Sequence, residues 1–170
     1  DSVLTSLKLD GNRIGHNGAA AIAEALRKNV TLTDLNIGTN QLSAAATLKI
    51  IRVEQNRGRL QSLGLRRCDI GAGIAQELAS LIDLSKSLKA LDISDNAVGA
   101  DGAASIAGAL QELTVHERSN FKASSKLTAL DLGRNGLGHD GLEALLDALS
   151  SNKALSTLGL AFNSLGPRNG

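Results

Sequence analysis

Aromatic residues are almost absent from this sequence of 170 residues, which has no Trp, Tyr or Met and only two phenylalanines, Phe121 and Phe162. Hydrophobic residues nevertheless make up 42% of the chain, and its length is that of about one domain of ordinary size. The chain can therefore bury a core, but that core has to be built from Leu, Ile, Val and Ala side chains.

Cysteine is scarce too, and neither sign of charge is in excess. The lone cysteine, Cys68, excludes an internal disulfide framework and favours a reducing compartment. The 18 basic residues are balanced by 17 acidic ones, and a net charge of +1 gives no sign of a nucleic-acid partner.

Long hydrophobic runs and a signal-peptide pattern are also absent. No apolar stretch approaches the roughly 20 residues that a membrane helix needs, and the chain starts at Asp1 without a signal peptide. We therefore expect a protein of the cytoplasm or another intracellular compartment that does not contact a membrane.

What the sequence contains in abundance is an internal repeat. Consecutive repeats start 28 residues apart, except that 39 residues separate the starts at Leu88 and Leu127. Because 39 − 28 = 11, about eleven residues, roughly 114–124, are inserted there. The six matching segments are LTSLKLDGNRIG from Leu4, LTDLNIGTNQLS from Leu32, LQSLGLRRCDIG from Leu60, LKALDISDNAVG from Leu88, LTALDLGRNGLG from Leu127 and LSTLGLAFNSLG from Leu155.

Two hydrophobic periods alternate within each repeat. The L-x-L core of each segment has period 2, which predicts a short strand with Leu91 and Ile93, for example, on one side. After a Gly or Ser the period becomes that of a helix. The predicted helical stripes include Ile22, Ala25 and Leu26, then Ile106, Ala109 and Leu110, and then Leu145, Ala148 and Leu149.

Polar pairs stand ahead of three of these helical stripes. Asn17-Gly18, Asp101-Gly102 and Asp140-Gly141 are expected to supply cap and turn chemistry. Repeat 2 fits the pattern least well, because Glu54 stands where sister repeats have a leucine such as Leu26.

The shared motif, L-x-x-L-x-L-x-x-N/C-x-L, resembles that of the leucine-rich repeats, and the 28-residue length resembles their ribonuclease-inhibitor-like subfamily. The resemblance covers the chain except the insertion, and it implies an α/β leucine-rich-repeat solenoid. In this right-handed βα horseshoe a parallel sheet lines the concave side and helices cover the convex side. Spacing alone predicts the same curvature, since strands stack about 4.8 Å apart and helices about 8–10 Å apart.

Residues 1–170 are expected to form one such domain, with repeats starting at 4, 32, 60, 88, 127 and 155. The first strand follows almost directly on Asp1, and the sixth repeat stops before its helix. Repeat arrays need polar capping repeats at their open ends, and none is visible here. We therefore expect the chain to be a piece of a longer protein.

Cys68 is the one candidate nucleophile, but its repeat position favours a structural role. Five asparagines occupy the same position in the other repeats: Asn12, Asn40, Asn96, Asn135 and Asn163. The resemblance implies that this column forms an inward hydrogen-bonded ladder in which Cys is an accepted substitute. No histidine stands at strand level in the same or a neighbouring repeat, so we expect no catalysis from Cys68.

Other motifs that could carry chemistry fail on spacing. GAGIAQ, residues 71–76, imitates a dinucleotide fingerprint but has Gln76 in place of the third glycine. His16 and His139 share a repeat position four repeats apart, which is too far to share a metal ion. Lys49, with Arg52, Arg57 and Arg59, forms a basic cluster without interleaved aromatics, a poor nucleic-acid signature. We expect no catalytic residue, cofactor or metal.

The concave face is the candidate binding surface. One column holds Arg67, Asp95, Arg134 and Phe162 on successive strands. These charges either pair with each other across strands or form a strip that meets a complementary protein, and the sequence leaves both readings open. The candidate residues of this face are Lys8, Asp34, Asn36, Arg66, Arg67, Asp92, Asp95, Asp131, Arg134 and Phe162.

The insertion is the second candidate, on the rim where a helix returns to the next strand. His116, Arg118 and Phe121 are its candidate contact residues. Loops on rigid scaffolds often carry function, which would make Phe121 an anchor for a partner. The alternative is that Phe121 folds back against the helix ends.

These observations favour a non-catalytic protein–protein interaction module or scaffold, whose partner is another protein of unknown identity. A first alternative is a structural subunit held permanently in a large intracellular assembly. A second is a GTPase-activating protein of the Ran type, which rests on likeness of repeat type alone, and fold does not fix function.

Overall fold

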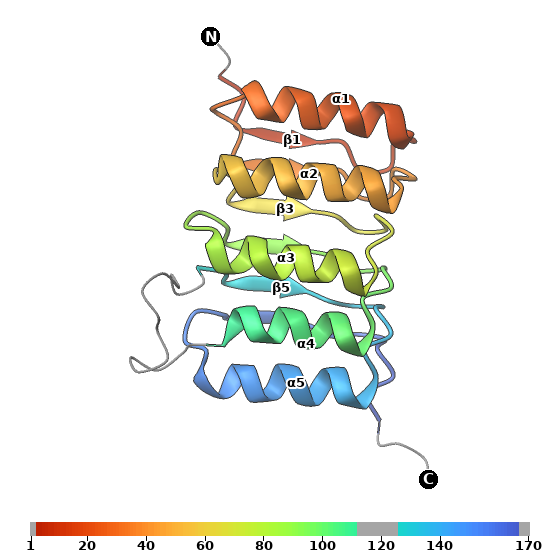
Figure 1. The fold of residues 1–170 in the computed structure, drawn as a ribbon, viewed down its shortest axis with the longest axis vertical. Coiled ribbons are helices and arrows are strands. Elements are labelled where there is room, and N and C mark those ends of the chain that lie inside the picture. Colours follow the sequence, from red (N-terminus) through yellow and green to blue (C-terminus); the bar gives the residue numbers. More distant parts are fainter. Residues whose placement is uncertain (1–2, 112–125, 167–170) are drawn as a thin grey trace.

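The computed structural model describes residues 3–111 and 126–166, and within them strands and helices alternate without exception. Each strand has three residues, and the helices have twelve to fourteen. In chain order the elements are β1 (Ser6–Lys8), α1 (Gly15–Lys28), β2 (Asp34–Asn36), α2 (Ala44–Arg57), β3 (Ser62–Gly64), α3 (Ala72–Leu84), β4 (Ala90–Asp92), α4 (Gly99–Leu110), β5 (Ala129–Asp131), α5 (Gly138–Ser151) and β6 (Thr157–Gly159) (Figure 1).

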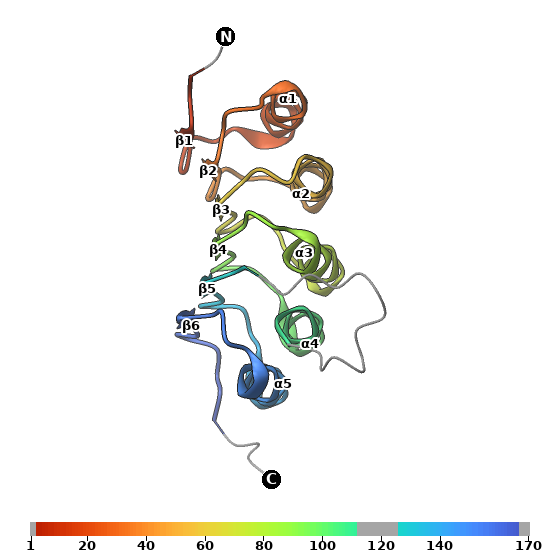
Figure 2. The same ribbon diagram turned by 90° about the vertical axis from the view of Figure 1, so that its left-hand side faces the viewer.

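The six strands form one parallel sheet in chain order. Residues of equal repeat position pair between neighbouring strands, so that Leu7, Leu35 and Leu63 lie side by side. Figure 2 shows the strands on one side and the helices on the other, with the stack curved so that the sheet lines the inner side. The predicted α/β solenoid with a concave parallel sheet is therefore confirmed.

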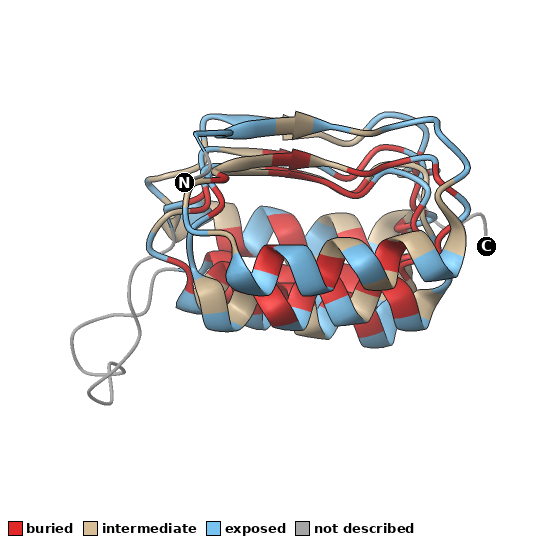
Figure 3. Ribbon diagram, turned by 90° about the horizontal axis from the view of Figure 1, so that it is seen from above, coloured by how far each residue is buried: buried red, intermediate tan, exposed pale blue. Residues whose placement is uncertain are grey.

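The core lies between the sheet and the helices (Figure 3). The middle leucines of the inner strands, such as Leu63 and Leu91, are at most 2% exposed. Within the described residues, every buried hydrophobic side chain is Leu, Ile, Val or Ala, apart from Cys68. The predicted core of Leu, Ile, Val and Ala is therefore confirmed for the part of the chain that the structure describes.

The predicted helical stripe is buried throughout α4, but not throughout α1 or α5, where Ile22 and Leu149 are half-buried. Ile106 and Leu145 are fully buried, whereas Ala25 is exposed. The residues at the same repeat position as Ala25, such as Val53 and Leu81, are buried in helices that have another helix before them. Ala25 belongs to the first described helix, so nothing in the described residues covers it.

The predicted helix caps are wrong by about one turn. Asn17, for example, lies inside α1, which begins at Gly15, and the residue before Gly15 makes no side-chain cap hydrogen bond. Gly15 has a φ of +65°, a left-handed conformation that favours glycine, and donates its N–H to the carbonyl of Asn40 in the next repeat at 3.0 Å. The same holds for α4 and α5, which begin at Gly99 and Gly138 rather than at Asp101-Gly102 and Asp140-Gly141. A backbone contact between repeats thus replaces the side-chain cap.

Candidate functional site

Each strand turns its first and third residues outward and its middle leucine inward. In β2, Asp34 and Asn36 are half-buried on either side of the buried Leu35. Because the strands pair in step, residues of equal repeat position line up across the concave face. The third strand residues form the column Lys8, Asn36, Gly64, Asp92, Asp131 and Gly159.

Three predicted contact residues in this column also serve the backbone next to them. The Asn36 amide oxygen accepts the N–H of Gly38 at 3.1 Å. A carboxylate oxygen of Asp92 accepts the N–H of Ser94 at 2.9 Å, and one of Asp131 accepts the N–H of Gly133 at 2.8 Å. These side chains therefore hold the backbone at the strand exits as well as lining the face.

Two glycines in the same column make room for their neighbours. A Cβ atom at Gly64 would lie 2.6 Å from the amide oxygen of Asn36, and one at Gly159 would lie 2.6 Å from a carboxylate oxygen of Asp131. The middle of the face is consequently a shallow hollow of about 340 Å³ with small side chains such as Ala90 along its floor.

A chain of contacts crosses the strand exits beside this hollow. The Arg66 guanidinium donates to Asp95, with Nε 2.8 Å from Oδ2, and Arg134 Nε lies 3.7 Å from Oδ1 of the same carboxylate. The Arg66 hydrogen bond holds the pKa of the Asp95 carboxyl below its usual value. Both arginine side chains stay more than half exposed. We call Arg66, Arg67, Arg134 and Phe162 the arginine ridge.

Phe162 ends the ridge as an exposed aromatic side chain. Its residue is 75% exposed, and the Arg134 guanidinium carbon lies 4.1 Å from the ring centroid. This stacked geometry is a cation–π contact. Phe162 has a φ of +60°, as the whole column has positive φ at Arg67, Asp95 and Arg134, which projects these side chains from the turn after each strand.

Of the cross-strand pairs among Arg67, Asp95 and Arg134 that the sequence left open, the described residues form Asp95–Arg134 but not Arg67–Asp95. Asp95 pairs with Arg66 rather than Arg67, because Arg66 sits one residue earlier and its guanidinium reaches the carboxylate directly. Arg67 makes no ion pair with any residue that the structure describes. Its exposed charge only adds to the field that favours the Asp95 carboxylate.

The remaining predicted residues of the face lie toward its first strands. Lys8 is exposed on β1, and the Asp34 carboxylate accepts a hydrogen bond from its neighbour Thr33 at 2.6 Å. Asn36 also donates to Asp10 at 3.2 Å.

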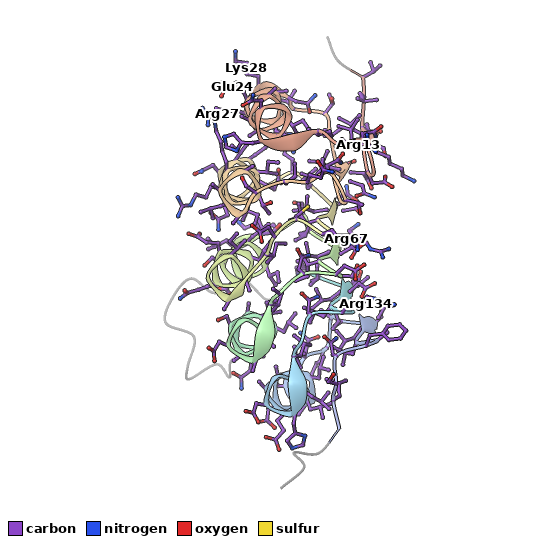
Figure 4. The ribbon with its side chains drawn as sticks, turned by 90° about the vertical axis from the view of Figure 1, so that its right-hand side faces the viewer. Arg13, Glu24, Arg27, Lys28, Arg67 and Arg134 are labelled. Atoms are coloured by element: carbon purple, nitrogen blue, oxygen red, sulfur yellow. The ribbon has the colours of Figure 1, made fainter. Side chains whose placement is uncertain are left out.

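Arg13 is an exposed cation on this side that the sequence reasoning missed. Figure 4 shows Arg13, Arg67 and Arg134 following one another down the strand side of the molecule. Arg13 stands two residues later in its repeat than Arg67 does, so a search by repeat column could not find it.

The asparagine column forms a ladder between repeats. The Asn40 amide donates to the carbonyls of Ile37 at 2.9 Å and Leu9 at 2.7 Å, and its oxygen accepts the N–H of Asn12 at 2.7 Å. Cys68 occupies this column, as the repeat position indicated, and is fully buried. Burial raises the pKa of its thiol to about 12, so it is not a thiolate nucleophile at neutral pH.

Neither a metal-ligand cluster nor a membrane-spanning helix occurs in the residues that the structure describes. Across residues 3–111 and 126–166, no three side chains from His, Cys, Asp and Glu gather closely enough to hold a metal ion. In the same ranges no helix has the length and apolar character needed to cross a bilayer. The predicted contact residues of the insertion, His116, Arg118 and Phe121, lie outside the described residues.

Comparison with known proteins finds one repeat family. The family model described as Leucine Rich repeat matches residues 2–23, 84–107 and 123–146. The chain is 31% identical over 167 residues, 97% of its length, to human NACHT, LRR and PYD domains-containing protein 5. It is 28% identical over 139 residues to pig ribonuclease inhibitor, and this match covers 64% of the present chain and 30% of the inhibitor. The matched region is only 13% of the human protein.

Solved structures of similar shape include two with low sequence identity. Leiomodin-1 actin-binding site 2 has a TM-score of 0.68 and 16% identity, over 82% of this chain and 77% of the other. The tropomodulin C-terminal domain of Caenorhabditis elegans has a TM-score of 0.67 and 19% identity, over 85% and 83%. At such identities the likeness concerns the fold alone.

Proposed function

Because this chain belongs to the leucine-rich-repeat family, with repeats of the ribonuclease-inhibitor-like type, we propose that its concave face binds another protein. Arrays of this kind offer an extended, curved and rigid surface for recognition. The observation that carries the proposal is Phe162, a largely exposed aromatic side chain stacked on Arg134 at the end of the arginine ridge.

Arginine and aromatic side chains dominate the binding energy of many interfaces. Here Arg134 is held between Asp95 and the Phe162 ring, so little side-chain freedom remains to be lost on binding. Arg67, two strands away in the same column, has no ion-pair partner in the described residues and can meet a carboxylate of the other protein. The hollow with its small side chains leaves space for that protein's backbone.

The chemistry of this face favours reversible binding over permanent assembly. Obligate interfaces resemble a cut hydrophobic core, whereas this face presents charged, small and hydrogen-bonded side chains around one phenylalanine. We therefore propose an exchanging recognition module that binds without catalysis, acts inside the cell, and does so without nucleic acid or membrane. We also retain the proposal that the insertion, through His116, Arg118 and Phe121, adds contacts at the rim.

We further propose that the repeats belong to a longer array. Leu146 in α5 is 54% exposed, whereas Ile51, Ala79 and Ala107 at the same repeat position are at most 9% exposed. Each of those three belongs to a helix that another helix follows. A further repeat would cover Leu146 in the same way.

A site-specific crosslinking experiment tests concave-face binding. Phe162 is replaced by photoreactive benzoylphenylalanine, and the same group is placed at the exposed Ser80 on the helix side as a control. We expect a protein crosslink from position 162 that is absent from position 80. Equal crosslinks from both positions, or none from 162, would contradict the proposal.

The protein captured in this way is then titrated against two variants of matched charge. Reversing two of the three ridge arginines, with Arg67→Glu and Arg134→Glu, should weaken binding at least tenfold. Lys86→Glu with Lys153→Glu changes the charge equally at exposed sites away from the concave face and should leave binding unchanged. Melting temperatures of both variants report whether the fold is retained.

A further inference from the structure

The convex side of the molecule is electrically divided. Helices α1 and α2 together carry five Lys and Arg residues and two Glu, a net charge of 5 − 2 = +3. Helices α3, α4 and α5 together carry six Asp and Glu residues and no Lys or Arg, a net charge of −6. The overall charge of +1 conceals this division, which composition alone does not reveal.

A groove runs along the positive half, between α1 and α2. Its volume is about 730 Å³, compared with about 320 Å³ for the hollow between α3 and α4. Its lining combines cations with apolar side chains and contains no carboxylate. The lining residues are Arg27, Ala45, Leu48, Lys49, Arg52, Val53 and Asn56.

The α3–α4 and α4–α5 pairs are brought together by glycine. A Cβ atom at Gly102 in α4 would lie 2.9 Å from the Cβ of Ala75 in α3, and one at Gly141 in α5 would lie 3.2 Å from the Cβ of Ala103 in α4. The same repeat position in α2 holds Ala46 instead. The α1–α2 pair therefore lacks this glycine contact, which is consistent with the larger space between the two helices.

The cations of the groove are available to an incoming group. Lys49 is exposed and makes no ion pair in the described part of the chain. Arg27 pairs with Glu24 at 3.3 Å on the outside of α1 (Figure 4), and both side chains are more than half exposed. Arg52 pairs with Glu77 of α3 at 2.7 Å, with the arginine 59% exposed. Exposed pairs of this kind contribute little energy, so a partner carboxylate can compete for both arginines.

From these observations we propose that the α1–α2 groove binds an acidic amphipathic segment of a partner protein. Apolar side chains of the segment would contact Leu48 and Val53, while its carboxylates would meet Arg27, Lys49 and Arg52. This is the helix-in-groove mode of recognition, in which one apolar stripe is laid into a groove. Nucleic acid fits less well, because the groove offers no aromatic side chain for base stacking. The site is separate from the concave face and does not depend on it.

The test uses a synthetic helical peptide with leucines at i, i+3, i+4 and i+7 and glutamates between them. A second peptide has every glutamate replaced by lysine. Binding of each labelled peptide is measured by fluorescence anisotropy, at low and high salt, and amide shifts are mapped by NMR. We expect the glutamate peptide alone to bind, less tightly at high salt, with shifts on α1 and α2.

Three variants locate the site. Lys49→Glu with Arg52→Glu should weaken the glutamate peptide at least tenfold, and Lys49→Glu alone should weaken it without disturbing the Arg52–Glu77 pair. Lys86→Glu with Lys153→Glu, an equal charge change elsewhere, should have no effect. Equal binding of both peptides, equal binding to wild type and Lys49→Glu, or shifts on the concave face would each overturn the proposal.

Sedimentation equilibrium of the protein alone tests whether a second copy of the chain occupies the groove instead. The acidic helices of a second copy also complement this groove, and in that case wild type would self-associate while the Lys49→Glu, Arg52→Glu variant would stay monomeric. That outcome would show that the groove mediates self-association, and it would overturn the proposal that a segment of a partner protein binds there. A monomeric wild type that binds the glutamate peptide supports the proposal.

Discussion

The returns from helix to strand that the structure describes take two different forms. In repeats 1, 3 and 5 a short side chain directly after the helix accepts two backbone N–H groups from the approach to the next strand. Asn152, for example, accepts those of Ala154 at 3.0 Å and Leu155 at 2.8 Å, and Asn29 and Ser85 act in the same way. In repeat 2 the acceptor is Glu54, from inside α2, which takes the N–H groups of Arg59 and Leu60.

Glu54 therefore replaces two residues of the sister repeats, a core leucine and a polar acceptor. Its residue is only 1% exposed, and its carboxylate is paired with Arg57 at 2.9 Å. Arg57 in turn donates to the Asn29 carbonyl at 2.9 Å and to the Leu32 carbonyl, which ties α2 to the return of repeat 1. The comparison teaches that a polar residue at a core position of the repeat need not destabilise the fold. Here its hydrogen bonds and ion pair replace the contacts that the sister repeats make.

Removing the Glu54 carboxylate should have the largest effect on the free energy of unfolding. Glu54→Ala leaves the Arg57 charge buried and two N–H groups without an acceptor, so we expect a loss of about 3–5 kcal/mol in the free energy of unfolding, measured by urea denaturation. Glu24→Ala is the matched control, since Glu24–Arg27 has the same i, i+3 spacing but is exposed, and it should cost at most about 0.5 kcal/mol. Similar losses in both variants would show that the buried pair is not the source of the effect.

An intermediate effect is expected at the ordinary returns. Asn152→Ala removes the acceptor of two N–H groups without leaving a buried charge, and should cost about 1–2 kcal/mol in the same urea assay. Asn152→Ser should recover most of this, because Ser85 serves the equivalent return of repeat 3. If serine restores nothing, the amide donor of Asn152, which reaches the Leu110 carbonyl at 2.6 Å, carries the effect instead.

The sequence predicted the repeat architecture because each repeat buries the same leucines in the same register. Leu35, Leu63 and Leu91 need no knowledge of the rest of the fold to be assigned to strands. It did not predict the role of Glu54, since a carboxylate on a helical stripe reads as a misfit until Arg57 and the returning backbone are placed around it.

The sequence also did not predict which of two adjacent arginines pairs with Asp95. Arg66 and Arg67 are adjacent, and only the turn geometry decides which guanidinium reaches Asp95. The α1–α2 groove depends on how closely two helices approach, a property that the pattern of apolar residues does not encode. The strand register can be predicted from the leucines of each repeat alone. Contacts between repeats depend on how two residues of different repeats are placed relative to each other, which the sequence pattern does not show.

The smallest effect concerns a position where one repeat lacks its polar acceptor altogether. At Asn40, Asn96 and Asn163 the ladder amide oxygen accepts two N–H groups of the preceding repeat, as Asn96 does for Cys68 at 2.9 Å and Ile70 at 3.1 Å. Cys68 has no such oxygen, and within the described residues no side-chain oxygen accepts the N–H of Asn40 or Leu42. Cys68→Asn should therefore raise the free energy of unfolding, by at most about 1 kcal/mol.

The pH dependence of this variant isolates the thiol. Burial raises the pKa of Cys68 from 9.0 to about 12, so the fold favours the protonated thiol. Its contribution to stability is complete below pH 9 and is lost as the pH rises toward 12, because there the unfolded state releases the proton first. The advantage of Cys68→Asn over wild type, measured by urea denaturation at each pH, should thus be constant up to pH 9 and grow above it. A constant difference across that range, or a loss of more than about 1 kcal/mol at neutral pH, would contradict this account of the asparagine ladder.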